Sequence, residues 1–271
     1  MRVIVTELNI YPLKSARGLP KARVRLASTG FEWDRHWMTV REDGTFLTQR
    51  TQPSLTRIVP QLNEDELILT SEGLEPLVLP LAPQGVGRSV RIWKDSCEGL
   101  DQGDAAAAWV STVLGEPVRL VRLPATPGRR ADPKYAGSDR APLAFPDAYP
   151  VLLCNRASLE DLNRRIPEAL PMARFRPNLV LEGLPPFAED RIAAIEIGAV
   201  ILTLVKPCTR CIIPSTDQRS GIRGFDPLPV LRTFRFDREL LGVTFGENAV
   251  ISRGVGELLE RGAACRVSYD N

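Results

Sequence analysis

The chain has 271 residues, of which 44% are hydrophobic and 25% charged, and its formal net charge at neutral pH is +2. This composition is typical of a globular protein with one large or two ordinary domains, and so mild a charge does not argue for nucleic-acid binding. No stretch approaches about 18 consecutive apolar residues, so no transmembrane helix is expected, and the first residues lack the features of a secretory signal.

Short apolar and β-branched runs dominate the first part of the chain. The first run covers residues 2–11 and ends at Pro12, and turn residues such as Glu42-Asp43-Gly44 separate the later ones. The other strands predicted here are 22–26, 36–41, 46–49, 57–59, 66–69, 77–79, 89–93 and 97–100. Many short strands with frequent turns favour an antiparallel barrel or sandwich over a βαβ sheet.

The middle of the chain contains the first predicted helix and a long irregular segment. The helix is expected over residues 104–114, with Asp104 as a cap and Gly115 as its end, and a strand follows at 118–123. Residues 124–150 are rich in Pro, Gly, Arg, Asp and Ala. A loop of this length is either functional or a connector, and we place a domain boundary near its start.

The last part of the chain again alternates strands with a few helices. Helices are predicted at 156–166, where Asn155 or Ser158 could act as the cap, and at 227–235. Strands are predicted at 178–181, 191–197, 200–205, 241–245, 248–252 and 263–269. The expected fold class is therefore mainly β with a few helices.

Five cysteines, an odd number, argue against a disulfide scaffold and favour a reducing cytoplasm. Three of them, Cys97, Cys154 and Cys265, lie within or beside apolar segments and are expected to be small core residues. The other two, Cys208 and Cys211, form a C-x-x-C motif directly after the predicted strand 200–205.

The C-x-x-C motif is weak evidence when taken alone. The motif could be half of a structural zinc site, but such a site needs four ligands, and the chain has a single histidine, His36. A thioredoxin-like redox pair would open a helix, which Ile212-Ile213-Pro214 does not favour. Two buried structural cysteines at a strand end remain the plain alternative.

Several cationic and polar residues stand at predicted strand edges or in loops, flanked by aromatic residues or proline. They are Lys14, Ser15, Arg35, Arg176, Asn178 and Arg210. Singly, each charge is most simply explained as solvated or locally paired. If they converged, they would form an anion pocket beside a thiolate, because arginine holds phosphate bidentately and nearby cations favour the thiolate form of cysteine.

These residues lie in motifs that resemble those of MOSC-domain proteins, and more closely the group that contains the mitochondrial amidoxime-reducing component and its bacterial relatives. The matching motifs are Ile10-Tyr11-Pro12-Leu13-Lys14-Ser15, Trp33-Asp34-Arg35-His36-Trp37, Ala157-Ser158-Leu159-Glu160-Asp161-Leu162-Asn163, Phe175-Arg176-Pro177-Asn178 and Cys208-Thr209-Arg210-Cys211. They occur in order over residues 4–268, which makes the resemblance specific.

The resemblance implies an N-terminal β-barrel-like domain over residues 1–122 and a C-terminal MOSC β-barrel domain over 123–271. It also implies a molybdenum–pyranopterin cofactor between them, with Cys211 as the catalytic residue and metal ligand and Cys208 as a neighbour of lesser role. The residues implied to bind the cofactor are Lys14, Ser15, Arg35, Arg176, Asn178, Thr209 and Arg210. Pyridoxal phosphate is not expected.

The activity implied is an oxidoreductase that reduces N-hydroxylated compounds such as amidoximes and hydroxylamines. The alternative is a carrier of molybdenum cofactor or of sulfur, the latter as a Cys211 persulfide. Compared with some members of that group, we expect no targeting or anchor segment and no C-terminal iron–sulfur extension, and therefore a separate electron donor of the ferredoxin or cytochrome b5 type. Ala148 and Tyr149 stand where related chains often carry hydroxyl residues.

Overall fold

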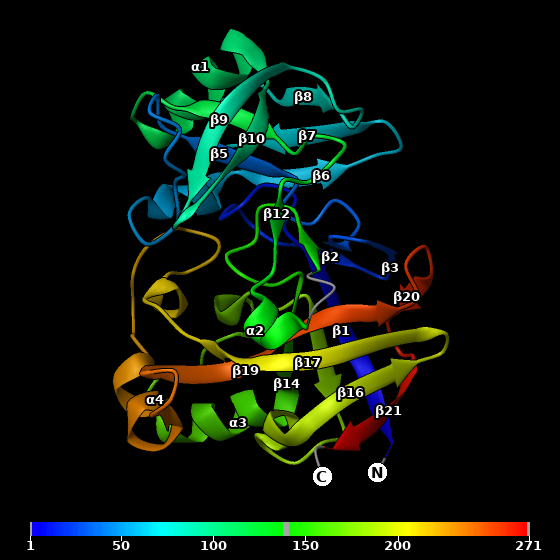
Figure 1. Ribbon diagram of the computed structural model, residues 1–271. Coiled ribbons are helices and arrows are strands. Elements are labelled where there is room, and N and C mark those ends of the chain that lie inside the picture. The colour runs from blue at the N-terminus through cyan, green and yellow to red at the C-terminus, as the bar shows by residue number, and fades with distance from the viewer. Residues whose placement is uncertain (1, 138–140, 270–271) are drawn as a thin grey trace.

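The computed structural model describes residues 2–137 and 141–269, and strands dominate it. The expected class, mainly β with a few helices, is confirmed. The chain forms a lower part built around a closed barrel and an upper part of smaller sheets, stacked on one another (Figure 1). No helix in the described part of the chain is long and apolar enough to cross a membrane.

The lower part is a closed barrel of seven strands, in which β14 pairs with both β15 and β19. In barrel order the strands are β14 (Val151–Asn155), β15 (Leu179–Glu182), β1 (Val3–Ile10), β21 (Ala264–Tyr269), β16 (Ile192–Ile197), β17 (Val200–Thr209) and β19 (Gly242–Arg253). Alternate apolar residues fill the interior, as Val3 and Val5 show on β1 and Ile195 and Ile197 on β16. This alternation is the period-two pattern of a half-buried strand.

The upper part consists of two sheets and a helix. One sheet has the order β5 (Trp37–Val40), β11 (Arg119–Arg122), β10 (Asp95–Asp101) and β9 (Val86–Ile92), and the other β6 (Val59–Leu62), β7 (Glu66–Thr70) and β8 (Leu77–Pro80). Helix α1 (Gly103–Leu114) covers their shared core with Ala106, Val110 and Leu114. Buried leucines from both sheets, among them Leu67 and Leu120, complete this core.

The chain crosses between the two parts near its start. Strand β1 belongs to the barrel, and the isolated bridge between Leu13 and Trp37 begins the upper part. The small strands beside the crossing are β2 (Leu19–Lys21), β3 (Arg23–Ala27), β4 (Gly30–Phe31) and β20 (Leu258–Glu260), of which β3 pairs with both β4 and β20. The barrel thus contains the first strand of the chain, while the division near residue 122 stays a prediction.

The helices agree with the sequence except at one cap. Helix α1 ends at Gly115 in the left-handed conformation as predicted, but Gln102 is its N-cap and Asp104 lies in the first turn. Helix α3 (Arg156–Arg165) begins where the Asn155 side chain accepts a hydrogen bond from the Ala157 amide. Helix α4 (Leu228–Arg235) packs Leu231 against the outer face of the barrel. The short helices are α2 (Pro133–Ala136), η1 (Pro53–Arg57), η2 (Met172–Phe175), η3 (Ala188–Arg191) and η4 (Ile213–Ser215).

Four expectations need correction. The strand predicted at 46–49 does not form, because only Thr45 and Phe46 make isolated bridges there. The segments 241–245 and 248–252 are one strand, β19, which begins in a hairpin with β18 (Phe236–Asp237) and passes through Gly246 at a φ of 75°. The predicted strand at 57–59 is wrong, because Pro53 starts the 3-10 turn η1 and β6 begins only at Val59. The segment 124–150 includes β12 (Arg129–Arg130), α2 and β13 (Pro142–Leu143), and its residues 138–140 lie outside the described part.

Candidate functional site

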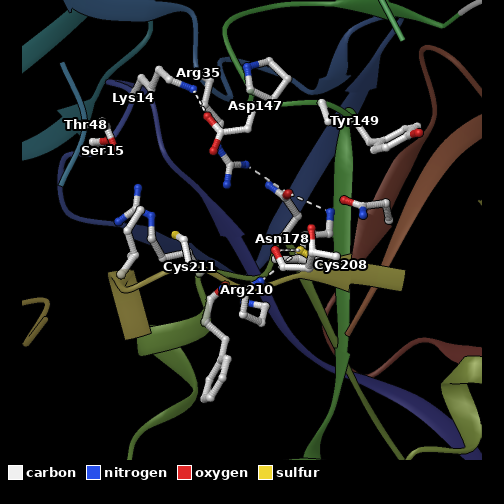
Figure 2. Close-up of a pocket in the computed structure, with 18 of the residues that line it drawn as sticks. Lys14, Ser15, Arg35, Thr48, Asp147, Tyr149, Asn178, Cys208, Arg210 and Cys211 are labelled. Atoms are coloured by element: carbon white, nitrogen blue, oxygen red, sulfur yellow. Dashed lines mark hydrogen bonds and ion pairs between the residues drawn. The ribbon is translucent and has the colours of Figure 1, made fainter. Parts of the chain in front are cut away.

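A cavity of about 340 Å³ lies where the upper part meets the barrel, and it collects the sequence motifs (Figure 2). All eight residues that the sequence singled out line it: Lys14, Ser15, Arg35, Arg176, Asn178, Thr209, Arg210 and Cys211. In Figure 2, Lys14 points toward Asp147 at one side, and Cys208, Arg210 and Cys211 lie together at the other. The volume lies within the range of small-molecule sites.

Backbone geometry presents several of these side chains. Ser15, Arg35 and Arg176 adopt left-handed φ angles of 66°, 53° and 57°. Such angles cost roughly 1–2 kcal/mol for a residue with a Cβ, and they concentrate at functional sites. Trp93, which also lines the cavity, has a φ of 55°.

Lys14 follows β1 and reaches a carboxylate from the segment 124–150. Its Nζ donates to the Phe145 carbonyl at 2.8 Å and to Asp147 Oδ1 at 2.5 Å, and Arg50 Nη2 donates to Asp147 Oδ2 at 2.9 Å. Burial lowers the pKa of Lys14 to about 8, against the opposing effect of Asp147. Burial would raise the pKa of the Asp147 carboxyl, but Lys14 and Arg50 hold it below its usual range.

Tyr11 separates two guanidinium groups behind the cavity. Arg35 and Arg176 stack over its ring at 4.3 and 4.2 Å from the centroid, and the Tyr11 hydroxyl donates to the Pro177 carbonyl at 3.0 Å. Arg35 Nη1 donates to Asp34 and, at 3.0 Å, to Asn178 Oδ1. The stacking compensates part of the cost of holding two cations near each other.

Arg176 is the most buried cation that lacks a direct carboxylate partner among the cavity-lining residues of the described structure. It is 8% exposed, and its Nη1 donates to the Ala16 carbonyl and to Gln218 Oε1, both at 2.8 Å. Burial lowers its pKa to about 10. A buried cation held by neutral acceptors retains its charge, which favours an anionic ligand nearby.

The C-x-x-C motif lies where β17 ends, not after it, because the strand continues to Thr209. Arg210 Nη1 donates to Cys208 Sγ at 3.1 Å and Nη2 to the Phe175 carbonyl at 2.8 Å, while its buried Nε has no partner in the described structure. Arg210 therefore ties the motif to the Phe175-Arg176 segment. Cys211 is partly exposed and adjoins Arg50, and no group of three His, Cys, Asp or Glu residues among those described could hold a metal.

The remaining cysteines only partly follow expectation. Cys154 and Cys265 are buried as predicted, whereas Cys97 on the β9–β10 hairpin is half-buried. All five cysteines are free thiols.

Several cavity residues escaped the sequence analysis. They are Thr48, Arg50, Trp93, Asp147, Lys206 and Asn248. Asp147 stands next to Ala148 and Tyr149, which also line the cavity, in the segment that was expected to be either functional or a connector. The sequence signal for Asp147 was thus its position in that segment. Arg50 lies in a turn and Trp93 directly follows β9, and neither position carries such a signal.

Comparisons with known proteins agree with these motifs. The MOSC N-terminal beta barrel domain matches residues 2–117, and the MOSC domain matches residues 140–264. The chain is 33% identical over 244 residues to "Mitochondrial amidoxime-reducing component 1" of Xenopus laevis, which covers 86% of this chain and 71% of that one. It is 32% identical over 266 residues to the Homo sapiens protein of the same name, which covers 91% and 78%.

Among solved structures, the YUAD protein from Bacillus subtilis covers 100% of this chain and 98% of its own at 10% identity, with a TM-score of 0.44. A likeness at that level supports no argument about function. The sequence matches do suffice, and on them the chain belongs to the MOSC-domain family, in the group that contains the amidoxime-reducing components.

Proposed function

We propose that the chain is a molybdenum-cofactor-dependent oxidoreductase that reduces N-hydroxylated compounds such as amidoximes and hydroxylamines. The names of its relatives support this activity, since they describe the reduction of amidoximes. The observation that carries the proposal is a partly exposed thiol, Cys211, in a cavity whose described lining includes six basic side chains and one carboxylate.

The residues present fit such a cofactor. A pyranopterin carries a phosphate, and the buried Arg176, which neutral acceptors hold, suits an anion. Lys14 and Arg35 add two cations from other segments, and Ser15, Asn178 and Thr209 add neutral groups. Thiolate sulfur is a ligand that soft and high-valent metals accept, and Cys211 supplies it in the same cavity.

Each group of residues has a distinct task in this proposal. Lys14, Arg35 and Arg176 bind the anionic part, with Tyr11 fixing the two guanidinium groups, and Arg210 anchors the motif that carries Cys211. When bound, the cofactor supplies the two-electron redox chemistry and an open position for the substrate oxygen. The overall reaction converts the N–OH group to N–H and water, and consumes two electrons and two protons.

The electron source and the location of the protein are also part of the proposal. We expect a separate donor protein of the ferredoxin or cytochrome b5 type to supply the electrons. The relatives are named as mitochondrial, and a cytoplasmic location for this chain stays a prediction.

The test is the pair of variants Cys211→Ala and Cys208→Ala, expressed in a molybdate-fed host. We expect Cys211→Ala to lose reduction of benzamidoxime with an artificial electron donor and to lose most of its molybdenum per chain, measured by mass spectrometry. Cys208→Ala should keep both, since only Cys211 is assigned to the metal. Molybdenum-dependent turnover that survives in Cys211→Ala would refute the assignment, and bound cofactor without turnover in the unmodified protein would favour a carrier.

A further inference from the structure

A half-exposed tryptophan stands at the tip of the β9–β10 hairpin and lines the cavity from the upper part. Trp93 follows Ile92, which pairs with Asp95, so Trp93 and Lys94 form the whole connection between the strands. Its side chain is 48% exposed, although the other three tryptophans are buried or half-buried. An indole ring left open at a cavity is a surface available to a ligand.

The ring is held in place. Its edge meets Phe46 at a centroid distance of 4.9 Å and an interplanar angle of 73°, and the Arg50 guanidinium lies 4.7 Å from its centroid. Phe46 is 8% exposed and belongs to the core of the β5–β11–β10–β9 sheet. Trp93 is therefore an ordered aromatic surface, so that a ligand stacking on it loses little further conformational freedom.

Arg50 connects this aromatic surface to the thiol. The same guanidinium that lies over one face of the indole pairs with Asp147. Burial lowers the pKa of Arg50, but Asp147 and the adjoining Cys211 raise it by more. One side chain thus separates Trp93 from Cys211, and all three line the same cavity. A substrate whose reacting group lies at Cys211 extends past Arg50 toward Trp93.

We propose that Trp93 determines substrate specificity, by favouring N-hydroxylated compounds in which the carbon bonded to the reacting nitrogen carries a flat aromatic group. This inference rests on the proposed function and adds the substrate class. The other two aromatic residues of the described lining, Tyr149 and Phe175, are 7% and 0% exposed, so Trp93 offers the large exposed aromatic face that a planar ring prefers. An aliphatic substituent of similar polarity gains ordinary contact there but no stacking.

The test compares benzamidoxime with acetamidoxime in the cofactor-loaded protein. Trp93→Gly removes the ring. Because Trp93 has a left-handed φ of 55°, which glycine adopts without strain, the hairpin should keep its fold. Loss of one stacking contact should raise KM for benzamidoxime about fivefold and leave kcat within about twofold, with acetamidoxime nearly unaffected. Trp93→Phe should restore most of the preference, and Lys94→Ala, in the same turn, is the matched control.

Equal losses for both substrates in Trp93→Gly would mean that the ring only supports the fold, and the inference would be overturned while the proposed function stood. A second measurement needs no turnover: calorimetric binding of benzamidine and acetamidine, the two products. Benzamidine should bind about fivefold more weakly to Trp93→Gly, and acetamidine equally to both proteins. If the loaded protein reduces neither substrate, the proposed function fails, and an unchanged benzamidine affinity would then reject the role of Trp93 as well.

Discussion

Two clusters of basic residues in this protein differ in whether carboxylates of the protein neutralise their positive charge. On the upper sheet, Arg88 and Arg119 both pair with Asp101, at 2.9 and 2.7 Å, and Arg119 also reaches Asp104 at 2.7 Å. In the cavity, Arg176 and Arg210 are held by carbonyl, amide and sulfur acceptors. The first cluster is neutralised within the protein, and the second is positioned without being neutralised.

The pKa values of the two clusters reflect this difference. Hydrogen bonds that Arg119 donates to Asp101 and Asp104 raise its pKa, whereas burial lowers the pKa of Arg176 to about 10 and that of Lys14 to about 8. The surface network favours its charges, whereas burial disfavours the charges of Arg176 and Lys14. Arg210 differs from these two, because burial lowers its pKa but the neighbouring cysteines raise it by more. Because a folded protein keeps disfavoured buried charge only where something compensates it, the cavity is best understood as half of an ion pair whose other half is a ligand.

The largest effect expected from this comparison concerns Arg176. Arg176→Gln should weaken binding of sulfate to the cofactor-free protein about tenfold or more, because one charged hydrogen-bond donor is lost from a buried site. The free energy of unfolding should change by only about 1 kcal/mol, since the lost hydrogen bonds are offset by the removal of a costly buried charge. Calorimetry and chemical denaturation measure the two quantities.

Arg119→Gln is the matched substitution in the neutralised cluster. It should leave sulfate binding unchanged and cost about 1 kcal/mol of stability, the scale of a partly exposed ion pair within a network. If both variants lost stability and neither lost sulfate affinity, the contrast between the clusters would be wrong.

The second prediction concerns Asp147, the carboxylate that lines the cavity. Asp147→Asn removes the partner of Lys14 and Arg50 and leaves their charges for a ligand. Sulfate should bind about fivefold more tightly to the cofactor-free variant, on the scale of one charge interaction screened by a protein surface. Weaker binding would show that Asp147 supports the site through geometry, and that the cavity charge matters less than the order of its side chains.

The sequence could predict which side chains meet in this site, but not how their charges pair. The motifs correctly indicated the side chains that meet, from Lys14 after β1 to Cys211 after β17. They did not indicate how the charges pair, because Asp147 lies 133 residues from Lys14 and 97 from Arg50, and no local pattern encodes contacts at that separation.

The same limit applies to the fold. The alternating strands were predictable, but Gly246-Glu247 resembles a turn, and only the pairing of β19 with β14 and β17 keeps it within one strand. Trp93 gave no signal at all, since a tryptophan after an apolar strand usually belongs to the core. What the sequence lacked in each case was the identity of the neighbour across the fold.

The smallest predicted effect, and the most specific, is the pH dependence that Lys14 imposes. Its pKa is about 8 in the folded protein and about 10.5 when unfolded, so between these values the unfolded chain binds the extra proton. The contribution of Lys14 to stability is therefore unfavourable and constant below pH 8, and becomes less unfavourable as the pH rises toward 10.5. The affinity for sulfate should instead fall as the pH rises, because the anion interacts with the charged amine.

We expect sulfate, whose own charge is constant in this range, to bind about threefold more weakly at pH 9 than at pH 7, a modest factor because the other cations of the cavity stay charged. In Lys14→Arg the side chain stays charged at both pH values, and every other titrating group is unchanged. The affinity of this variant for sulfate should therefore be the same at pH 7 and pH 9. His36 does not interfere, since burial lowers its pKa to about 4. An equal decline in both proteins would assign the pH dependence to another group, and with it the claim that burial holds Lys14 close to losing its proton would fail.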